Sequence, residues 1–197
     1  MMTKDLDMSK FRTPDYEIPS FFTERWSPRA MSGEEVTREE LMRLFEAARW
    51  APSSFNNQPW RFLYSLRNSE HWKTFLSLLV PLNKVWSQNS GVLIVVLSKR
   101  TFDYNNRPSP THSFDAGAAW QNLALMGSVL GLAVHAMQGF EYEKTRIELN
   151  IPEEYEVEAM VAVGRPGPLE VLPEKLRDRE VPSGRKKVSE LVTEGGL

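Results

Sequence analysis

The sequence predicts an α+β fold in which one sheet is covered by helices. Segments with helical periodicity are interspersed with short segments that are continuously apolar or that alternate apolar and polar residues. The chain has 197 residues, enough for one compact domain with a single core. Residues 1–17 and about 164–197 show neither pattern. We therefore expect an N-terminal arm over residues 1–17 and one domain over residues 18–197 that includes a C-terminal arm.

The clearest helix begins at residues 37–40, where Thr-Arg-Glu-Glu forms a capping box. Apolar residues then recur on one helical face, and Pro52 ends the helix because proline disfavours helical geometry in the residue before it. The apolar residues of this face are Leu41, Leu44, Phe45 and Ala48. A shorter helix is expected over residues 19–25.

The pattern beyond Pro52 predicts four strands and three helices. The strands are expected at residues 60–66, 92–97, 132–137 and 157–163, and the helices at residues 70–79, 114–130 and 142–149. The 92–97 segment is continuously apolar, as in a central strand covered on both faces. Pro81 is expected to stop the 70–79 helix. The polar 98–113 loop is long enough to be a lid or a dimer contact.

Composition excludes several classes of function. The chain has 24 basic and 26 acidic residues, so its formal net charge of −2 gives no long-range attraction to nucleic acid or to an anionic membrane. It has no cysteine, which rules out thiolate chemistry, disulfides and thiolate metal sites. This is compatible with a reducing cytoplasm, where we expect the protein. Residues 1–20 lack an apolar segment, so we expect no signal peptide.

Four short motifs of well-known sites are absent from the sequence. They are G-x-G-x-x-G, the P-loop, H-E-x-x-H and G-x-S-x-G. The three histidines stand far apart in the sequence, so a catalytic triad or a histidine-based metal site would need the fold alone to bring them together. We therefore expect no metal site and no hydrolytic site.

One segment raises the alternative of a membrane helix. Residues 116–140 contain no Asp, Glu, Lys or Arg, and Gly127 and Gly131 match the small-xxx-small pattern of packed membrane helices. However, Trp, Gln, Asn and Ser interrupt the segment, and Gly131 has the position of a helix terminator before a strand. We expect a buried helix followed by a buried strand.

The first candidate site is Arg25-Trp26-Ser27-Pro28-Arg29. In an extended backbone alternate side chains share a face, so Arg25, Ser27 and Arg29 would point the same way. Two guanidinium groups and a hydroxyl are suited to an anion, because arginine donates in a planar fork to phosphate oxygens. A solvated charged turn is the alternative interpretation.

The second candidate site is the polar loop over residues 51–60, Ala-Pro-Ser-Ser-Phe-Asn-Asn-Gln-Pro-Trp. Its hydroxyl and amide groups are able to bond the donor and acceptor edge of a flat heterocycle, while Trp60 anchors the next strand. The same residue types are also turn formers, so an ordinary connection between helix and strand stays open.

Together these motifs resemble the FMN-dependent nitroreductase family, in which R-x-S-x-R/K is followed about 25 residues later by A-P-S-S-x-N-x-Q-P-W. Further similarity lies in four segments. Residues 115–131 resemble the family's central dimer helix, and residues 137–140 resemble the strand end near the flavin ring. Residues 161–166 resemble the last core strand, and residues 182–187 resemble the C-terminal basic segment. The resemblance extends over residues 19–192. It implies a central, mostly antiparallel mixed sheet flanked by helices, and a homodimer whose C-terminal arms reach the partner subunit.

The resemblance also implies which residues bind FMN at the dimer interface. Arg25 and Ser27 would bind the phosphate and the ribityl chain, joined by Arg185 from the end of the chain. Arg29 would lie near N1 and the C2 carbonyl, where a fixed cation favours the reduced, anionic flavin. Trp26 stands where the family more often has a small residue, His or Arg, and would alter the shape of the pocket near the phosphate.

Other residues are assigned to the flavin ring by the same resemblance. The loop residues would come from the partner subunit and comprise Pro52, Ser53 and Ser54, with Asn56 and Gln58 beside them. After Met137, the backbone N–H of Gln138 or Gly139 would point at the flavin N5. Asn83 would bond the pyrimidine edge.

The activity implied by the resemblance is a ping-pong hydride transfer through flavin N5, from NADH or NADPH to a nitroaromatic, a quinone or a similar acceptor. No catalytic side chain is named, because no side-chain acid or base is clearly required. Two alternatives stay open: a non-catalytic FMN-binding protein, and a relative specialised for reductive dehalogenation or flavin fragmentation. Trp86, where some members carry Lys, and the shortness of the chain bear on the choice of acceptor.

Overall fold

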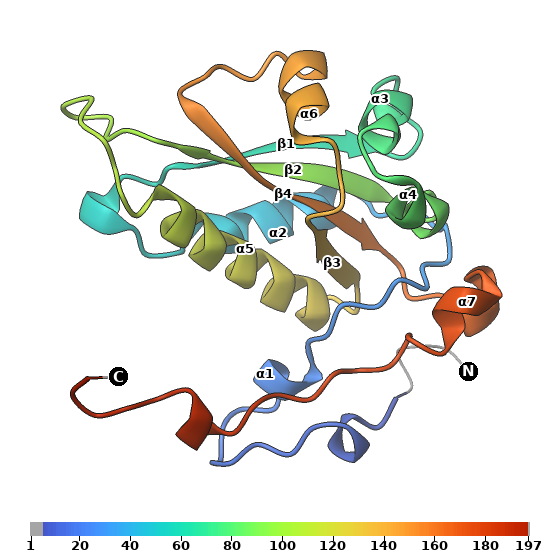
Figure 1. Ribbon diagram of the computed structural model, residues 1–197. Helices are drawn as coiled ribbons and strands as arrows, with labels where there is room; N and C mark the ends of the chain where they lie inside the picture. Colours follow the sequence, from blue (N-terminus) through green and yellow to red (C-terminus); the bar gives the residue numbers. More distant parts are fainter. Residues whose placement is uncertain (1–5, 197) are drawn as a thin grey trace.

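A four-stranded sheet with the order β1-β2-β4-β3 forms the centre of the protein (Figure 1). The computed structural model describes residues 6–196. The strands are β1 (Trp60–Leu66), β2 (Val92–Lys99), β3 (Ala133–Met137) and β4 (Tyr155–Gly164). All three neighbouring pairs run antiparallel. The α+β prediction is confirmed, and over residues 6–196 the sheet is wholly antiparallel, without the parallel pair of a mixed sheet.

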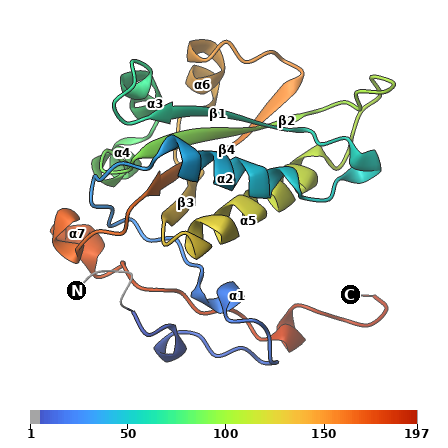
Figure 2. The same cartoon turned by 180° about the vertical axis from the view of Figure 1, so that it is seen from behind.

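Helices lie on both faces of this sheet (Figures 1 and 2). On one face α2 (Arg38–Arg49) and α5 (His112–Val129) pack against each other and against the strands. The opposite face is covered mainly by short helices, which contribute to a second apolar cluster. These short helices are α3 (Trp72–Ser77), α4 (Pro81–Ser87), α6 (Tyr142–Glu148) and α7 (Glu174–Arg177).

Helix α2 confirms the capping-box prediction. The Thr37 Oγ1 accepts a hydrogen bond from the Glu40 amide at 3.2 Å, and the Glu40 Oε2 accepts one from the Thr37 amide at 2.9 Å. Leu41, Leu44 and Ala48 are fully buried, so the predicted apolar face is the one that packs on the sheet.

The region around Pro81 differs from the prediction. Pro81 does not end a helix over residues 70–79; it is the first residue of α4, and α3 is only six residues long. Proline is tolerated at the first helical position, because its missing N–H would have no partner there. The proline that was expected to end one helix therefore begins the next helix instead.

Helix α5 and strand β3 pack closely. A Cβ added to Gly127 would lie 2.3 Å from the Val134 Cγ2, so only glycine allows this approach. The helix ends just before Gly131, whose φ of +69° permits the turn into β3. Within residues 6–196, none of the helices combines the length and apolarity needed to cross a membrane.

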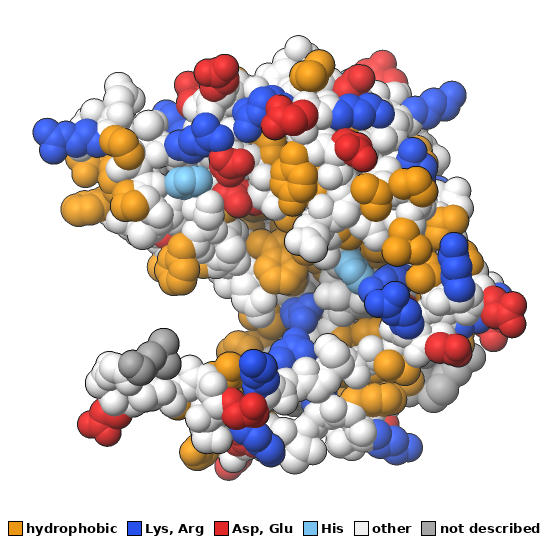
Figure 3. All heavy atoms as spheres, in the orientation of Figure 1, with side chains coloured by type: hydrophobic (Ala, Val, Ile, Leu, Met, Phe, Trp, Pro, Cys, Tyr) orange, Lys and Arg blue, Asp and Glu red, His pale blue; other side chains and the backbone are white. Residues whose placement is uncertain are grey.

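The two ends of the chain run beside each other, away from the sheet (Figures 1 and 2). Asp15 joins them, because its carboxylate accepts from the Lys187 Nζ and from the Val188 amide, each at 2.8 Å. On one side of the molecule, a cleft lies between these segments and the sheet with its helices (Figure 3). Their helical turns are η2 (Met8–Lys10), α1 (Phe21–Glu24) and η5 (Val188–Glu190), whereas η4 (Leu169–Val171) packs beside α7 on the apolar cluster of the sheet.

Candidate functional site

Three guanidinium groups from distant parts of the chain converge beside the cleft. Arg25 follows α1, Arg12 belongs to the N-terminal segment and Arg185 to the C-terminal segment. Burial is the main cause that lowers the pKa of Arg25, and the positive charge of Arg185 lowers it further. The pKa of Arg12 is lowered by burial and by the charges of Arg185 and Arg25. Hydrogen bonds place the three residues together: Arg12 and Arg185 both donate to the Ser183 carbonyl, at 3.0 and 3.3 Å, and Arg12 also donates to the Arg25 carbonyl at 2.7 Å.

No carboxylate of residues 6–196 forms a salt bridge with any of these three arginines. The Arg25 Nη1 donates to the Ser27 Oγ at 3.2 Å, so the structure brings together the first two residues of the predicted phosphate site. A partly buried cluster of like charges beside a hydroxyl is an arrangement that an anion stabilises.

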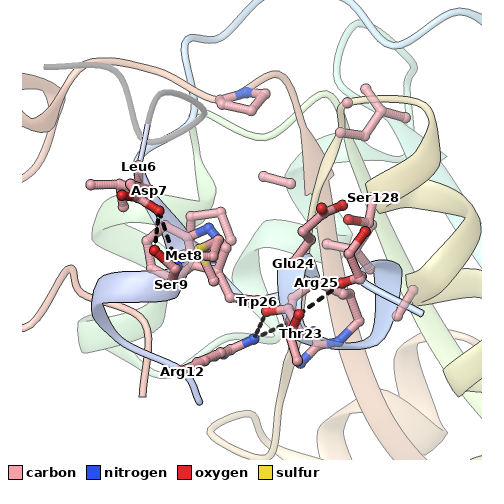
Figure 4. A pocket seen from close by; sticks show the side chains of 18 of the residues that line it. Leu6, Asp7, Met8, Ser9, Arg12, Thr23, Glu24, Arg25, Trp26 and Ser128 are labelled. Atoms are coloured by element: carbon pink, nitrogen blue, oxygen red, sulfur yellow. Dashed lines mark hydrogen bonds between the residues drawn. The ribbon is translucent and has the colours of Figure 1, made fainter. Parts of the chain in front are cut away.

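Arg12 was not identified from the sequence. Its Nη1 donates to the carbonyl oxygens of Thr23 and Arg25, both at 2.7 Å (Figure 4), and its Nε donates to the Ser183 carbonyl at 3.0 Å. It therefore ties the segment that carries Arg25 to the segment that carries Arg185. An isolated arginine in an irregular polar stretch has no periodicity or motif that could have revealed this role.

A cavity of about 740 Å³ opens next to the cluster. Arg12, Arg25 and Trp26 line it on one side, and Ser128 of α5 and the first residues of β3 line it on the other (Figure 4). A cavity of this size falls in the usual range for small-molecule and cofactor sites. Trp26 thus lines this cavity.

Arg29 differs from the three clustered arginines in having an acidic partner. Its Nη1 is 3.5 Å from the Oε2 of Glu180, a residue of the C-terminal segment that was also not identified from the sequence. The Glu180 Oε1 accepts from the amides of Arg29 at 2.5 Å and Ala30 at 2.8 Å. Of the three residues expected to form one anion site, Arg25 and Ser27 are hydrogen-bonded to each other, whereas Arg29 is paired with an acid.

His135 joins the Arg25–Arg29 segment to the sheet. Its Nδ1 lies 3.2 Å from the Pro28 carbonyl oxygen, and its ring lies 4.8 Å from that of Trp86. Burial, followed by the positive charge of Arg29, lowers the pKa of His135 to about 4. The imidazole is therefore neutral at physiological pH, as expected for a histidine packed in the core.

The end of β3 carries two amides that face no internal acceptor. In the part of the chain that the structure describes, the N–H groups of Gln138 and Gly139 donate to no backbone carbonyl. The Asn83 Nδ2 donates to the Gly139 carbonyl at 3.0 Å, and a Cβ at Gly139 would lie 2.5 Å from this nitrogen. Met137 is buried, with its sulfur 3.6 Å from the Ser87 Oγ, so its side chain belongs to the core.

The predicted loop over residues 53–59 has an unusual backbone. Phe55, Asn56 and Gln58 have φ values of +51°, +52° and +49°, which are uncommon for residues other than glycine. Polar contacts hold this shape: the Ser53 Oγ accepts from the Gln58 amide at 3.0 Å, and the buried Asp115 accepts from the Ser54 amide at 3.1 Å. Strained loops fixed in this way often occur at binding sites.

This loop and the arginine cluster lie at opposite ends of α5. The loop, with η3 (Ser54–Asn56), contacts the first turn of α5 through Asp115, whereas the cavity near Arg25 is lined by Ser128 of its last turn. An 18-residue helix is about 27 Å long. One copy of the chain therefore does not bring Pro52, Ser53 and Ser54 to the same place as Arg25.

The structure also brings together a serine, a histidine and a glutamate. The Ser98 Oγ lies 2.7 Å from the His112 Nδ1 and also bonds Glu158. Ser98 is fully buried, and Glu158 approaches the same ring nitrogen as the serine does. A catalytic triad needs an accessible nucleophile and a carboxylate on the opposite ring nitrogen, so this cluster joins β2, β4 and α5 without forming a triad.

Comparisons with known proteins agree on one family. A model of the nitroreductase family matches residues 22–80 and 78–165. An Archaeoglobus fulgidus protein named as an NADH dehydrogenase/NAD(P)H nitroreductase is 27% identical over 146 residues, which cover 72% of this chain and 81% of that protein. Protein DrgA of a Synechocystis species is 28% identical over 159 residues, which cover 66% of this chain and 74% of that protein.

Two solved structures extend the agreement to the fold. The crystal structure of an oxidoreductase containing FMN has a TM-score of 0.91 and 41% sequence identity, and the match covers 94% of this chain and 96% of that chain. A nitroreductase in complex with FMN from Desulfovibrio desulfuricans has a TM-score of 0.72 and 25% identity, covering 92% and 99% of the two chains.

Proposed function

The chain belongs to the nitroreductase family, and from this premise we propose that it is an FMN-dependent oxidoreductase that uses NADH or NADPH to reduce quinones, nitroaromatics or similar electron-poor acceptors. The observation that carries the proposal is the group of Arg12, Arg25 and Arg185. These residues are brought together by shared and neighbouring backbone acceptors, and none of them forms a salt bridge with a carboxylate of residues 6–196. Such a group fits the permanently charged phosphate of FMN.

The residues that follow β3 fit the flavin ring. The N–H groups of Gln138 and Gly139 have no backbone acceptor in the described chain and are suited to the N5 atom. Asn83 is held beside them by the Gly139 carbonyl, which leaves its side-chain oxygen available for the pyrimidine edge. Arg29, whose side chain is 28% exposed although it faces Glu180, would lie near N1 and the C2 carbonyl of the flavin.

We further propose that the site is completed by a second copy of the chain, in a cytoplasmic homodimer. Support comes from the distance along α5 that separates the 53–59 loop from the arginine cluster. Pro52, Ser53 and Ser54, with Asn56 and Gln58, would then reach the FMN of the partner subunit. The exposed Phe114 and Val129, at the two ends of α5, are 80% and 68% exposed in the single chain and fit burial in such an interface.

When bound, FMN would supply the hydride chemistry that links the nicotinamide to the second substrate in a ping-pong sequence. Arg25, Arg185 and Arg12 hold the anionic tail, and the Gln138 and Gly139 amides orient the ring edge. Trp26 limits the space around the phosphate. No side chain is assigned the role of acid or base, so the residues act by binding, orienting and electrostatic stabilisation.

A steady-state assay tests the proposal. Purified protein reconstituted with FMN is expected to oxidise NADH or NADPH in the presence of menadione or a nitroaromatic compound, with the parallel-line kinetics of a ping-pong mechanism. FMN that binds but is not reduced by either nicotinamide would contradict the enzymatic proposal and favour a flavin-binding protein without turnover.

A further inference from the structure

Glu180 is the carboxylate that the C-terminal arm buries most completely. Its side chain is 0% exposed, and one oxygen, Oε1, accepts from the Arg29 and Ala30 amides at 2.5 and 2.8 Å. The other oxygen, Oε2, has no hydrogen-bond partner among the described residues and faces the Arg29 guanidinium at 3.5 Å. A buried charge without compensation is strongly unfavourable, and the Arg29 guanidinium is the cation that faces this buried carboxylate.

The contact between the two side chains is an ion pair without a hydrogen bond. A separation of 3.5 Å with no donor aimed at Oε2 leaves the N–H groups of Arg29 able to bond another acceptor. The Arg29 side chain is also 28% exposed, in contrast to the fully buried side chain of Glu180. The negative charge of Glu180 thus offsets part of the positive charge of Arg29, while the N–H donors of Arg29 stay available to another acceptor.

The two ends of the proposed flavin site differ in this respect. Arg12, Arg25 and Arg185 have no acidic partner within residues 6–196, whereas Arg29 has a buried one. The phosphate of FMN is always anionic, so full positive charge at that end only strengthens binding. The ring gains negative charge near N1 only on reduction, so positive charge at that end changes the balance between the two redox states.

We propose that Glu180 is a positioning residue that sets the reduction potential of the bound flavin, by fixing Arg29 and offsetting part of its charge. This inference rests on the proposed function, which places Arg29 beside N1 and the C2 carbonyl. Because Glu180 offsets part of the charge of Arg29, the reduced flavin is stabilised less strongly. A less stabilised reduced flavin gives up its hydride more readily to the acceptor. The partly neutralised cation still donates hydrogen bonds to the ring.

The test is the midpoint potential of bound FMN in Glu180→Gln, measured by equilibration with a reference dye. The amide still accepts from the Arg29 and Ala30 amides but carries no charge. We expect reduced FMN to be favoured over oxidised FMN about tenfold more than in the wild type, which for a two-electron couple is a positive shift of about 30 mV. Glu174→Gln, which removes an exposed carboxylate from the same arm, is the charge-matched control and should leave the potential unchanged.

Two further variants keep the inference testable if Glu180→Gln loosens the arm. Arg29→Gln should shift the potential in the negative direction, and the double variant should lie between the two single variants. An unchanged or lower potential in Glu180→Gln, or a double variant no higher than Arg29→Gln, would overturn the inference. A wild-type protein that takes up no FMN would contradict the proposed function itself, whereas FMN uptake without these shifts would contradict only the role of Glu180.

Discussion

The body of the protein, residues 30–164, and its two arms, residues 6–29 and 165–196, are held by different interactions. The body contains nearly all of the buried apolar side chains, gathered in two clusters on the two faces of the sheet. The arms contribute few of them, chiefly Leu172 and Leu176, and are fastened by polar groups such as Arg12, Asp15 and Glu180.

Because of this difference, we expect the body to determine the stability of the fold and the arms to determine ligand binding. Apolar burial stabilises the body whether or not a ligand is present. The arms bring three guanidinium groups together against their mutual repulsion, so the energy that favours this arrangement is expected to come partly from a bound anion. Substitutions in the body should therefore change unfolding, and substitutions in the arms should change flavin binding.

The largest effect is expected from Leu44→Ala in α2. Leu44 is fully buried between α2 and the sheet, and truncating such a side chain leaves a cavity. The free energy of unfolding should fall by about 2–5 kcal/mol, as measured by chemical denaturation. Met42→Ala on the exposed side of the same helix is the control. A loss below about 1 kcal/mol for Leu44→Ala would show that the body is not held by its apolar core.

Arg25→Ala and Arg185→Ala should each weaken FMN binding by roughly 1.5–3 kcal/mol, the scale of charge-assisted hydrogen bonds. Their free energies of unfolding without FMN should stay near the wild-type value, since neither side chain belongs to the core. Isothermal titration with FMN and denaturation of the apoprotein measure the two quantities. Unchanged FMN affinity in both variants would mean that the phosphate site is misassigned.

The body should also lose stability in mild acid through His135. Its pKa is about 4 in the folded protein, below the ordinary value, so the unfolded chain binds more protons between about pH 6.5 and pH 4. Stability is therefore complete above this range and falls as pH drops, by about 2 kcal/mol at pH 5. His135→Gln should flatten this part of the profile and His71→Gln, at an exposed site, should not. Identical profiles for wild type and His135→Gln would refute the assignment.

The smallest effect is expected from Arg12→Ala. This change removes three hydrogen bonds to carbonyl groups of Thr23, Arg25 and Ser183, and so loosens the two arms from each other. FMN binding should weaken by about 1 kcal/mol, with faster proteolysis of the arms and little change in global unfolding. Arg43→Ala on the exposed face of α2 is the control. If Arg12→Ala unfolds the protein as readily as Leu44→Ala does, body and arms are not energetically distinct.

The body was also the part that the sequence predicted well. The capping box at Thr37, the apolar run of β2 and the alternation in β4 are local signals, and each element formed where its signal lay. Local sequence signals gave a wrong prediction where one residue type is compatible with two different structures. Pro81 is able to end a helix or begin one, and here it begins α4.

The site was predictable only in part, because its contacts are tertiary. Arg25, Ser27 and Arg185 were named from a motif, and the structure places the first two in hydrogen-bond contact. The roles of Glu180 and Arg12 were not predicted, because each residue contacts a segment far away in the chain. Glu180 accepts a hydrogen bond from a backbone amide 150 residues earlier. No periodicity or short motif encodes a contact of that separation. The contribution of the 53–59 loop stays a prediction, since it concerns a second subunit.

The central claim is that the arms clamp the phosphate of a flavin with guanidinium groups. Titration of the apoprotein with FMN and with riboflavin, which has the same ring but no phosphate, tests it most directly. Quenching of flavin fluorescence reports binding. We expect FMN to bind at least tenfold more tightly than riboflavin, and we expect added inorganic phosphate to compete with FMN. Equal affinity for the two flavins, or no uptake of either by the protein, would contradict the account.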